Sequence, residues 1–320
     1  MAIRSIVGLF TSSASASSEA TDIHSVRLMN SPAANLPMTD LPIAVYKYLT
    51  ADRAATVVGK LLIRFSQASV LNDATELKPP FKGVGTPEEV KKVILERLKL
   101  RFPDLMNQIA TRLPAHIAAE MIDNVISKAA VEAEAALPQS AKKIYDSLDK
   151  NFGVLSLSET PTDSLLWGYY GDGGYGFLIR FDPQHSWFWA RQNEEDDFRH
   201  LGQVAYVATR APKYVIELKG ADALYSKGIE WEHEREWRII RNFNDAVQKV
   251  GPDPYGKDVL LFAIPPDCLR GIVIGYRAKP ESVARIREIV ARNPSLLHVQ
   301  FERAAMRADG QIEILSDDKL

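Results

Sequence analysis

Acidic and aromatic side chains alternate between residues 230 and 238, where the chain runs Glu-Trp-Glu-His-Glu-Arg-Glu-Trp-Arg. Alternate residues of a β-strand share a face, so a strand here would gather Glu234, Glu236 and Arg238, with Glu232 beside them. Neighbouring carboxylates shift each other's pKa values toward acid or base chemistry. The pattern therefore predicts a catalytic carboxylate pair, although it also fits a solvated edge strand whose glutamate and arginine side chains neutralise one another.

The aromatic side chains are unevenly distributed. All five tryptophans lie between Trp167 and Trp237. Tryptophan is large, and its indole N–H needs an acceptor, so this clustering suits either a bulky core or a pocket in which rings stack on a ligand.

A glycine-rich stretch at residues 171–176 matches the pattern G-x-G-x-x-G. A dinucleotide-binding loop of that pattern opens a helix, whereas a strand is expected here at 177–181. We therefore predict a hairpin, in which the glycines either let the backbone approach a ligand or turn the chain.

A different chemistry is suggested by Glu217 and Lys219, which would point the same way from a strand over residues 215–219. Metal-dependent nucleases place a metal ligand beside a lysine in this manner, with an upstream aspartate for which Asp182 is the candidate. The six histidines are scattered and the one cysteine cannot build a zinc site, so we otherwise predict no bound metal.

The totals describe an ordinary globular chain. It has 320 residues, 46% hydrophobic and 25% charged, and a net charge of −2 gives no global attraction to nucleic acid. A single cysteine favours a reducing, cytoplasmic setting. No apolar run approaches the roughly 20 residues of a membrane-spanning helix, so we expect no membrane partner.

The order of the predicted elements indicates an α+β protein with a mixed, twisted sheet. Residues 1–35 form a predicted low-complexity disordered tail, and 36–320 a single domain with a helical insertion at about 86–150 on one side of the sheet. Strand patterns precede the insertion between 41 and 66 and return from 152 onward, with a further helix at about 281–291.

Several motifs together resemble the bacterial domain-of-unknown-function family 2971, over roughly residues 41–315. They are Tyr46–Tyr48, Leu62–Ser66, Leu71–Asp73 with Glu76, Leu155–Glu159, Leu166–Tyr170 with Gly176–Phe177, Trp231 with Glu234–Arg238, and Gly271–Gly275. The turn at 72–74 has alanine where the family usually has proline. Membership implies a bacterial protein without implying an activity.

A more distant similarity is to ADP-ribosyltransferase-like folds. It implies that Tyr46 or Tyr48 on a first strand, Trp167 and Tyr170 on a middle strand, and a late Glu-x-Glu strand surround NAD. The candidate catalytic residues are Glu234 and Glu236, and the candidate cofactor-binding residues are Tyr46, Lys47, Tyr48, Trp167, Tyr170, Trp237 and Arg238.

The expected chemistry follows from these residue types. Cleaving the ribose–nicotinamide bond builds positive charge on the sugar, which a carboxylate stabilises, while a second carboxylate takes the acceptor's proton. Aromatic faces would hold nicotinamide, and Lys47 or Arg238 the pyrophosphate. The leading hypothesis is an NAD-using transferase or toxin-like defence effector with a protein or nucleic-acid acceptor. The alternatives are the Glu217/Lys219 nuclease and a non-catalytic module that binds a small molecule or a protein.

Overall fold

The computed structural model describes residues 41–73, 75–192, 196, 198–217 and 224–317, so the tail predicted at 1–35 lies outside the described residues. This part of the chain divides into two compact units. One comprises 78–148 with 210–217, and the other 41–77, 149–209 and 224–317. This division differs from the single domain predicted over 36–320, because the helical block has a core of its own.

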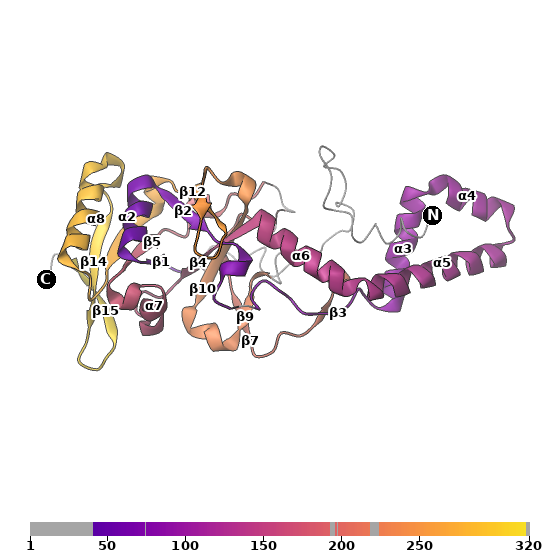
Figure 1. The fold of residues 1–320 in the computed structure, drawn as a ribbon, viewed down its shortest axis with the longest axis horizontal. Helices are drawn as coiled ribbons and strands as arrows, with labels where there is room; N and C mark the ends of the chain where they lie inside the picture. Colours follow the sequence, from indigo (N-terminus) through magenta and orange to yellow (C-terminus); the bar gives the residue numbers. More distant parts are fainter. Residues whose placement is uncertain (1–40, 74, 193–195, 197, 218–223, 318–320) are drawn as a thin grey trace. The chain divides into compact units, whose positions relative to one another are not determined.

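A mixed eight-stranded sheet is the centre of the second unit, which confirms the α+β class (Figure 1). Its order is β15 (Ile312–Ser316), β14 (Gln300–Met306), β13 (Leu269–Ile274), β5 (Phe177–Phe181), β1 (Val45–Leu49), β4 (Phe152–Ser158), β10 (Glu236–Asn242) and β6 (Gly202–Gln203). The β13–β14 pair is parallel, and the other neighbouring pairs are antiparallel.

Strand alternation gives this sheet two apolar faces. In β1, Val45 and Leu49 join a core with α2 (Ala51–Lys60) and α8 (Pro280–Arg292), which lie side by side in Figure 1. Tyr48 points to the opposite face, where the short helix α7 (Ser164–Tyr169) presents Trp167 edge-on to its ring at 5.4 Å. The strands that lie between these two apolar layers are therefore buried on both faces, which explains their nearly continuous apolar sequences.

A small second sheet in the same unit pairs β11 (Gln248–Pro252), β12 (Asp258–Ala263) and β2 (Leu62–Phe65) in that order. It is tied to the main sheet by a bridge between Ser66 and Val154 of β4. One edge of β4 therefore has β1 as its neighbour at Ser158 and Ser66, just after β2, as its neighbour at Val154.

The helical unit contains α3 (Pro87–Arg101), α4 (Pro103–Arg112), α5 (Ala115–Ala135) and most of α6 (Leu137–Asn151), with the short strands β3 (Phe81–Gly83) and β8 (Lys213–Tyr214) paired. Its first helix starts at a capping box, in which the Thr86 side chain accepts from the Glu89 N–H and Glu89 accepts from the Thr86 N–H. Val90, Ile94 and Leu98 follow at helical spacing and form its core with α5.

The strand predicted at 215–219 is wrong in its described part. Val215–Glu217 form a 3-10 turn, in which the exposed Glu217 accepts a hydrogen bond from the Tyr214 N–H at 2.8 Å. A side chain engaged in closing its own turn is not presented from a strand as a metal ligand. Lys219 lies outside the described residues.

The hairpin predicted for the glycine-rich stretch is wrong, because the helix α7 and a 3-10 turn at Asp172–Gly174 precede β5, and the glycines of this stretch pack closely against other parts of the protein. A Cβ at Gly176 would lie 2.2 Å from the Leu49 carbonyl oxygen, and one at Gly174 would lie 2.4 Å from the Tyr276 ring. Gly174 also has a φ of 90°, which L side chains rarely adopt. These glycines therefore serve close packing and a left-handed turn.

Within the described part of the chain, no helix has both the length and the apolar character needed to cross a membrane.

Candidate functional site

A polar cleft opens where β1 and β4 separate. The two strands are paired at Tyr46 and Ser158, whereas β4 and β10 stay in register over seven residue pairs. In the gap, the Lys47 ammonium donates to the Ser156 carbonyl oxygen at 2.8 Å in place of a backbone partner. The resulting cavity has a volume of about 330 Å³, and its walls come entirely from the sheet unit.

The segment before β10 departs from the predicted strand. Residues Ile229–Glu234 form a 3-10 helix, and Arg235 then adopts a left-handed conformation with φ 44°, so β10 begins only at Glu236. Strand alternation therefore does not relate Glu234 to Glu236, and Glu232 is exposed. The tight turn at Arg235 nevertheless returns the Glu234 carboxylate to the side of the sheet occupied by Glu236.

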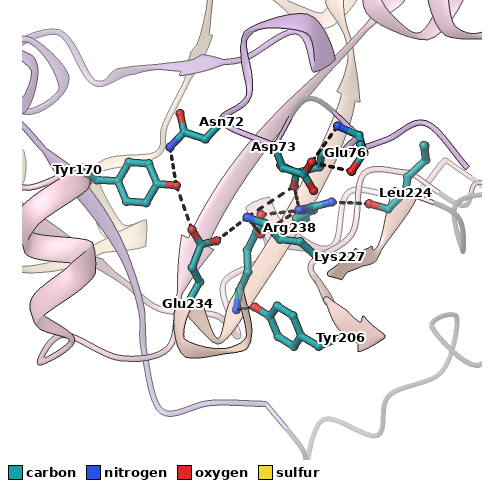
Figure 2. A network of polar contacts seen from close by, with 11 residues as sticks. Asn72, Asp73, Glu76, Tyr170, Tyr206, Leu224, Lys227, Glu234 and Arg238 are labelled. Atoms are coloured by element: carbon teal, nitrogen blue, oxygen red, sulfur yellow. Dashed lines mark hydrogen bonds and ion pairs between the residues drawn. The ribbon is translucent and has the colours of Figure 1, made fainter. Parts of the chain in front are cut away.

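Both carboxylates meet at Lys227 of β9 (Ser226–Gly228), and Figure 2 shows Glu234 beside this lysine. The Lys227 Nζ lies 2.5 Å from Glu234 Oε2 and 3.2 Å from Glu236 Oε2. All three side chains are nearly inaccessible to solvent. Burial alone would lower the pKa of Lys227, but Glu236 and Glu234 raise it above its ordinary value, so the ammonium stays charged.

Arg238 forms the second cation of this network. Its Nε donates to Glu236 Oε1 at 2.6 Å and its Nη2 to Glu236 Oε2 at 2.8 Å, a bidentate pair. It also pairs with Glu76 and donates from Nη1 to the Leu224 carbonyl oxygen at 2.7 Å (Figure 2). Three buried carboxylates therefore surround two buried cations.

The two candidate catalytic residues differ in the partners that hold their oxygens. Both oxygens of Glu236 are engaged by Arg238 and Lys227, and burial raises its pKa, a shift that Lys227 opposes and Glu234 reinforces. Glu234 accepts from the Tyr170 hydroxyl at 2.9 Å, and Tyr170 in turn accepts from the Asn72 amide at 2.9 Å. Glu234 is thus held by one cation and one neutral hydroxyl, whereas Glu236 is held by two cations.

The predicted site residues separate into two groups. Glu234 and Glu236 line the cleft together with Tyr46, Lys47, Tyr48 and Tyr170. The structure does not bring Trp167, Trp237 or Arg238 to the cleft lining, since each is at most 1% exposed.

The two tryptophans are core residues with satisfied indoles. Trp167 lies on α7 rather than on a middle strand, and its Nε1 donates to the Pro161 carbonyl oxygen at 2.9 Å. Trp237 points to the α2 and α8 side of the sheet and donates from Nε1 to Glu159 at 3.0 Å. Because their rings are covered by protein on both faces, we do not retain them as ligand-stacking residues.

Several polar members of the site were not predicted from the sequence. Lys227 and Glu76 complete the buried network, and Arg53, Arg64 and Asp253 line the cleft. Arg64 and Asp253 pair with each other at 2.6 Å. Glu76 belongs to one motif of the family resemblance, but it ends a polar stretch that by itself suggests only an exposed turn.

Lys47 lies among these groups with its pKa lowered to about 8. Burial is the largest cause, Arg53 and Lys227 add to it, and Glu236 and Glu234 oppose it. A partly neutral amine therefore faces the cleft near physiological pH, in contrast to an ordinary lysine.

Replacing Lys47 with methionine is expected to raise the free energy of unfolding at pH 7 by about 1–2 kcal/mol, because it removes a buried charge while retaining the length of the side chain. The folded-state pKa lies below the ordinary value of 10.5, so the unfolded chain binds more protons between these pH values. Wild-type stability should therefore rise from pH 8 to 10.5, and the advantage of the variant should shrink. Urea denaturation at pH 7 and pH 10 measures this, and a variant less stable than wild type at pH 7 would contradict it.

No group of three or more histidine, cysteine, aspartate or glutamate side chains suited to a metal ion occurs among the described residues. Comparison of the chain with protein-family models, with curated proteins and with solved structures finds no match in any of the three.

Proposed function

We propose that the cleft binds NAD and that the protein is an enzyme that transfers or releases its ADP-ribosyl group, with Glu234 at the ribose. The observation that carries this proposal is the position of the Glu234 carboxylate, which lies in a cleft lined by several tyrosines and is oriented by Tyr170 and Lys227. We also propose membership of family 2971, a cytoplasmic location and the role of a defence effector, with a protein or nucleic acid as acceptor.

The size and lining of the cleft fit part of such a molecule. A volume of about 330 Å³ lies at the low end for small-molecule sites and suits the nicotinamide riboside portion. Tyr169 and Tyr255 line the cleft and are 63% and 77% exposed, so their rings are accessible to stack on a flat heterocycle. Lys47 and Arg53 supply positive charge for phosphates.

In the reaction, the bond between the ribose C1′ and the nicotinamide nitrogen breaks, its electron pair leaves with nicotinamide, and an acceptor oxygen or nitrogen bonds to C1′. Glu234 would stabilise the positive charge that develops on the ribose and then accept the acceptor's proton. Tyr170 and Lys227 hold its two oxygens in place. Glu236 stays paired with Arg238 throughout, so its role is to fix Lys227 beside Glu234.

Incubating the full-length protein with NAD and following free nicotinamide by chromatography tests the proposal. We expect nicotinamide release, and replacing Tyr170 with phenylalanine should slow it about tenfold, since Glu234 loses a hydrogen bond that orients it. Tyr169→Phe is the matched control, because the structure gives the Tyr169 hydroxyl no hydrogen bond among the described residues.

Two outcomes would count against this assignment. Saturable NAD binding without nicotinamide release, in the presence of candidate protein or nucleic-acid acceptors, would favour the alternative of a non-catalytic binding module. An absence of both binding and release would remove NAD as the ligand.

A further inference from the structure

Two cations of the cleft lining lack an acidic partner. Within the described residues, the one polar contact of the Lys47 ammonium is the neutral Ser156 carbonyl oxygen. Arg53, in the first turn of α2, is exposed and makes no hydrogen bond or ion pair in the same part of the chain. The two are close enough for Arg53 to depress the pKa of Lys47.

The acids of the cleft are already engaged by other cations. Asp253 pairs with Arg64 at 2.6 Å, Glu236 forms the bidentate pair with Arg238, and Glu234 contacts Lys227 at 2.5 Å. These acids still attract Lys47 through space, but each is largely neutralised by its own partner. The protein thus keeps two like charges near each other without providing the anion that would balance them.

We propose that Lys47 and Arg53 form a binding subsite for a phosphoryl anion. Two positive charges are best balanced by a ligand with about two negative charges, which a phosphate monoester or a pyrophosphate carries near pH 7 and a carboxylate does not. Arg53 offers a planar set of donors and Lys47 a point charge, the two means by which proteins hold phosphoryl oxygens.

Occupancy of this subsite is coupled to protonation. Between pH 7 and 9, part of the free protein carries Lys47 as the neutral amine, since its pKa is about 8. An anion that contacts the ammonium raises that pKa, so binding takes up a proton from solution. At pH 6.5 the amine is already protonated, and binding should occur without uptake.

The subsite deepens the proposed function, in which Lys47 and Arg53 supply charge for phosphates, but phosphoryl binding does not require the glycosyl transfer, because Glu234 and Tyr170 are not part of the subsite. It also does not require NAD, since any ligand with a phosphoryl group would use the same two cations. The experiment therefore measures binding alone and uses probes that cannot release nicotinamide.

Calorimetric titration of the full-length protein with sulfate and with ADP-ribose tests the subsite, because neither probe titrates between pH 6.5 and 9. Titrations in two buffers of different ionisation enthalpy give the number of protons taken up. We expect roughly 0.5–0.8 proton per site at pH 8.5 and less than about 0.1 at pH 6.5. Adenosine, which lacks a phosphoryl group, should bind at least tenfold more weakly than ADP-ribose.

Three variants distinguish the effect of positive charge on binding from the proton uptake by Lys47. Lys47→Arg should retain binding but lose proton uptake, because arginine does not titrate in this range. Lys47→Met and Arg53→Met should each weaken sulfate and ADP-ribose binding at least tenfold. Lys60→Met is the matched control, since Lys60 is an exposed lysine at the end of the same helix and outside the cleft lining.

Sulfate or ADP-ribose binding that is unaffected in Lys47→Met and Arg53→Met, or that takes up no proton at pH 8.5, would overturn the subsite. ADP-ribose binding with proton uptake but no nicotinamide release from NAD would retain the subsite and reject the proposed reaction. If sulfate and ADP-ribose both fail to bind and acetate binds instead, the ligand is a carboxylate and the phosphoryl assignment is wrong.

Discussion

Replacing Arg238 with methionine is expected to lower the free energy of unfolding by about 3–5 kcal/mol, the range observed when one partner of a buried ion pair is removed. Arg238 is fully buried and holds Glu236 bidentately, pairs with Glu76 and donates to the Leu224 carbonyl oxygen. Without it, two buried carboxylates and a carbonyl oxygen lose their main donor, and Lys227 alone cannot neutralise three acids.

Urea denaturation followed by circular dichroism measures this loss. Arg235→Met is the matched control, because the Arg235 side chain is 65% exposed and lies 3.9 Å from Glu159, so its removal should change stability by less than about 0.5 kcal/mol. The double variant Arg238→Met with Glu236→Met should recover part of the loss, since it removes a charge together with its partner. Equal stability of wild type and Arg238→Met would show that the network is not a main determinant of this fold.

The second large effect is expected at Glu234. Replacing it with glutamine should reduce nicotinamide release from NAD by roughly 10²- to 10⁴-fold, the range associated with a positioned carboxylate or general base. Glutamine has nearly the same shape and can still accept from the Tyr170 hydroxyl. The change also leaves two carboxylates with two cations in the network, so folding should be affected far less than in Arg238→Met.

Glu232→Gln is the control for this variant, because Glu232 lies in the same 3-10 segment but is exposed. It should release nicotinamide at the wild-type rate. A Glu234→Gln protein that is folded, binds NAD and retains full activity would remove Glu234 from the mechanism. Reduced activity accompanied by an equal loss of folded protein would show only a structural contribution.

Local sequence patterns predict much of the fold. Pro87 after Thr86 with Glu89 specifies the start of α3, because proline is pre-organised for the first helical turn and the threonine and glutamate satisfy its free N–H groups. Apolar alternation or continuity predicts β1, β4, β5 and β13 because burial on one or both faces selects those side chains. The α+β class and the mixed sheet follow from the order of such elements.

Within the site, the sequence indicated that Glu234 and Glu236 belong together, but it gave the wrong geometry for them. A continuous strand would have placed Glu232 beside both, whereas the left-handed Arg235 ends a 3-10 turn and starts β10. The positive φ of a non-glycine residue is imposed by the surrounding structure, since the residue's own backbone preference opposes that conformation.

Only the tertiary structure determined which partners complete the site. Glu76 meets Arg238 across 162 positions of sequence, and Lys47 meets Ser156 across 109. The tertiary structure also decided that Trp167 and Trp237 lie in the core, on opposite faces of one sheet. Local periodicity specifies which face of an element is apolar. The packing of distant elements determines which charged side chains become neighbours. The pKa of Lys47 therefore depends on that packing.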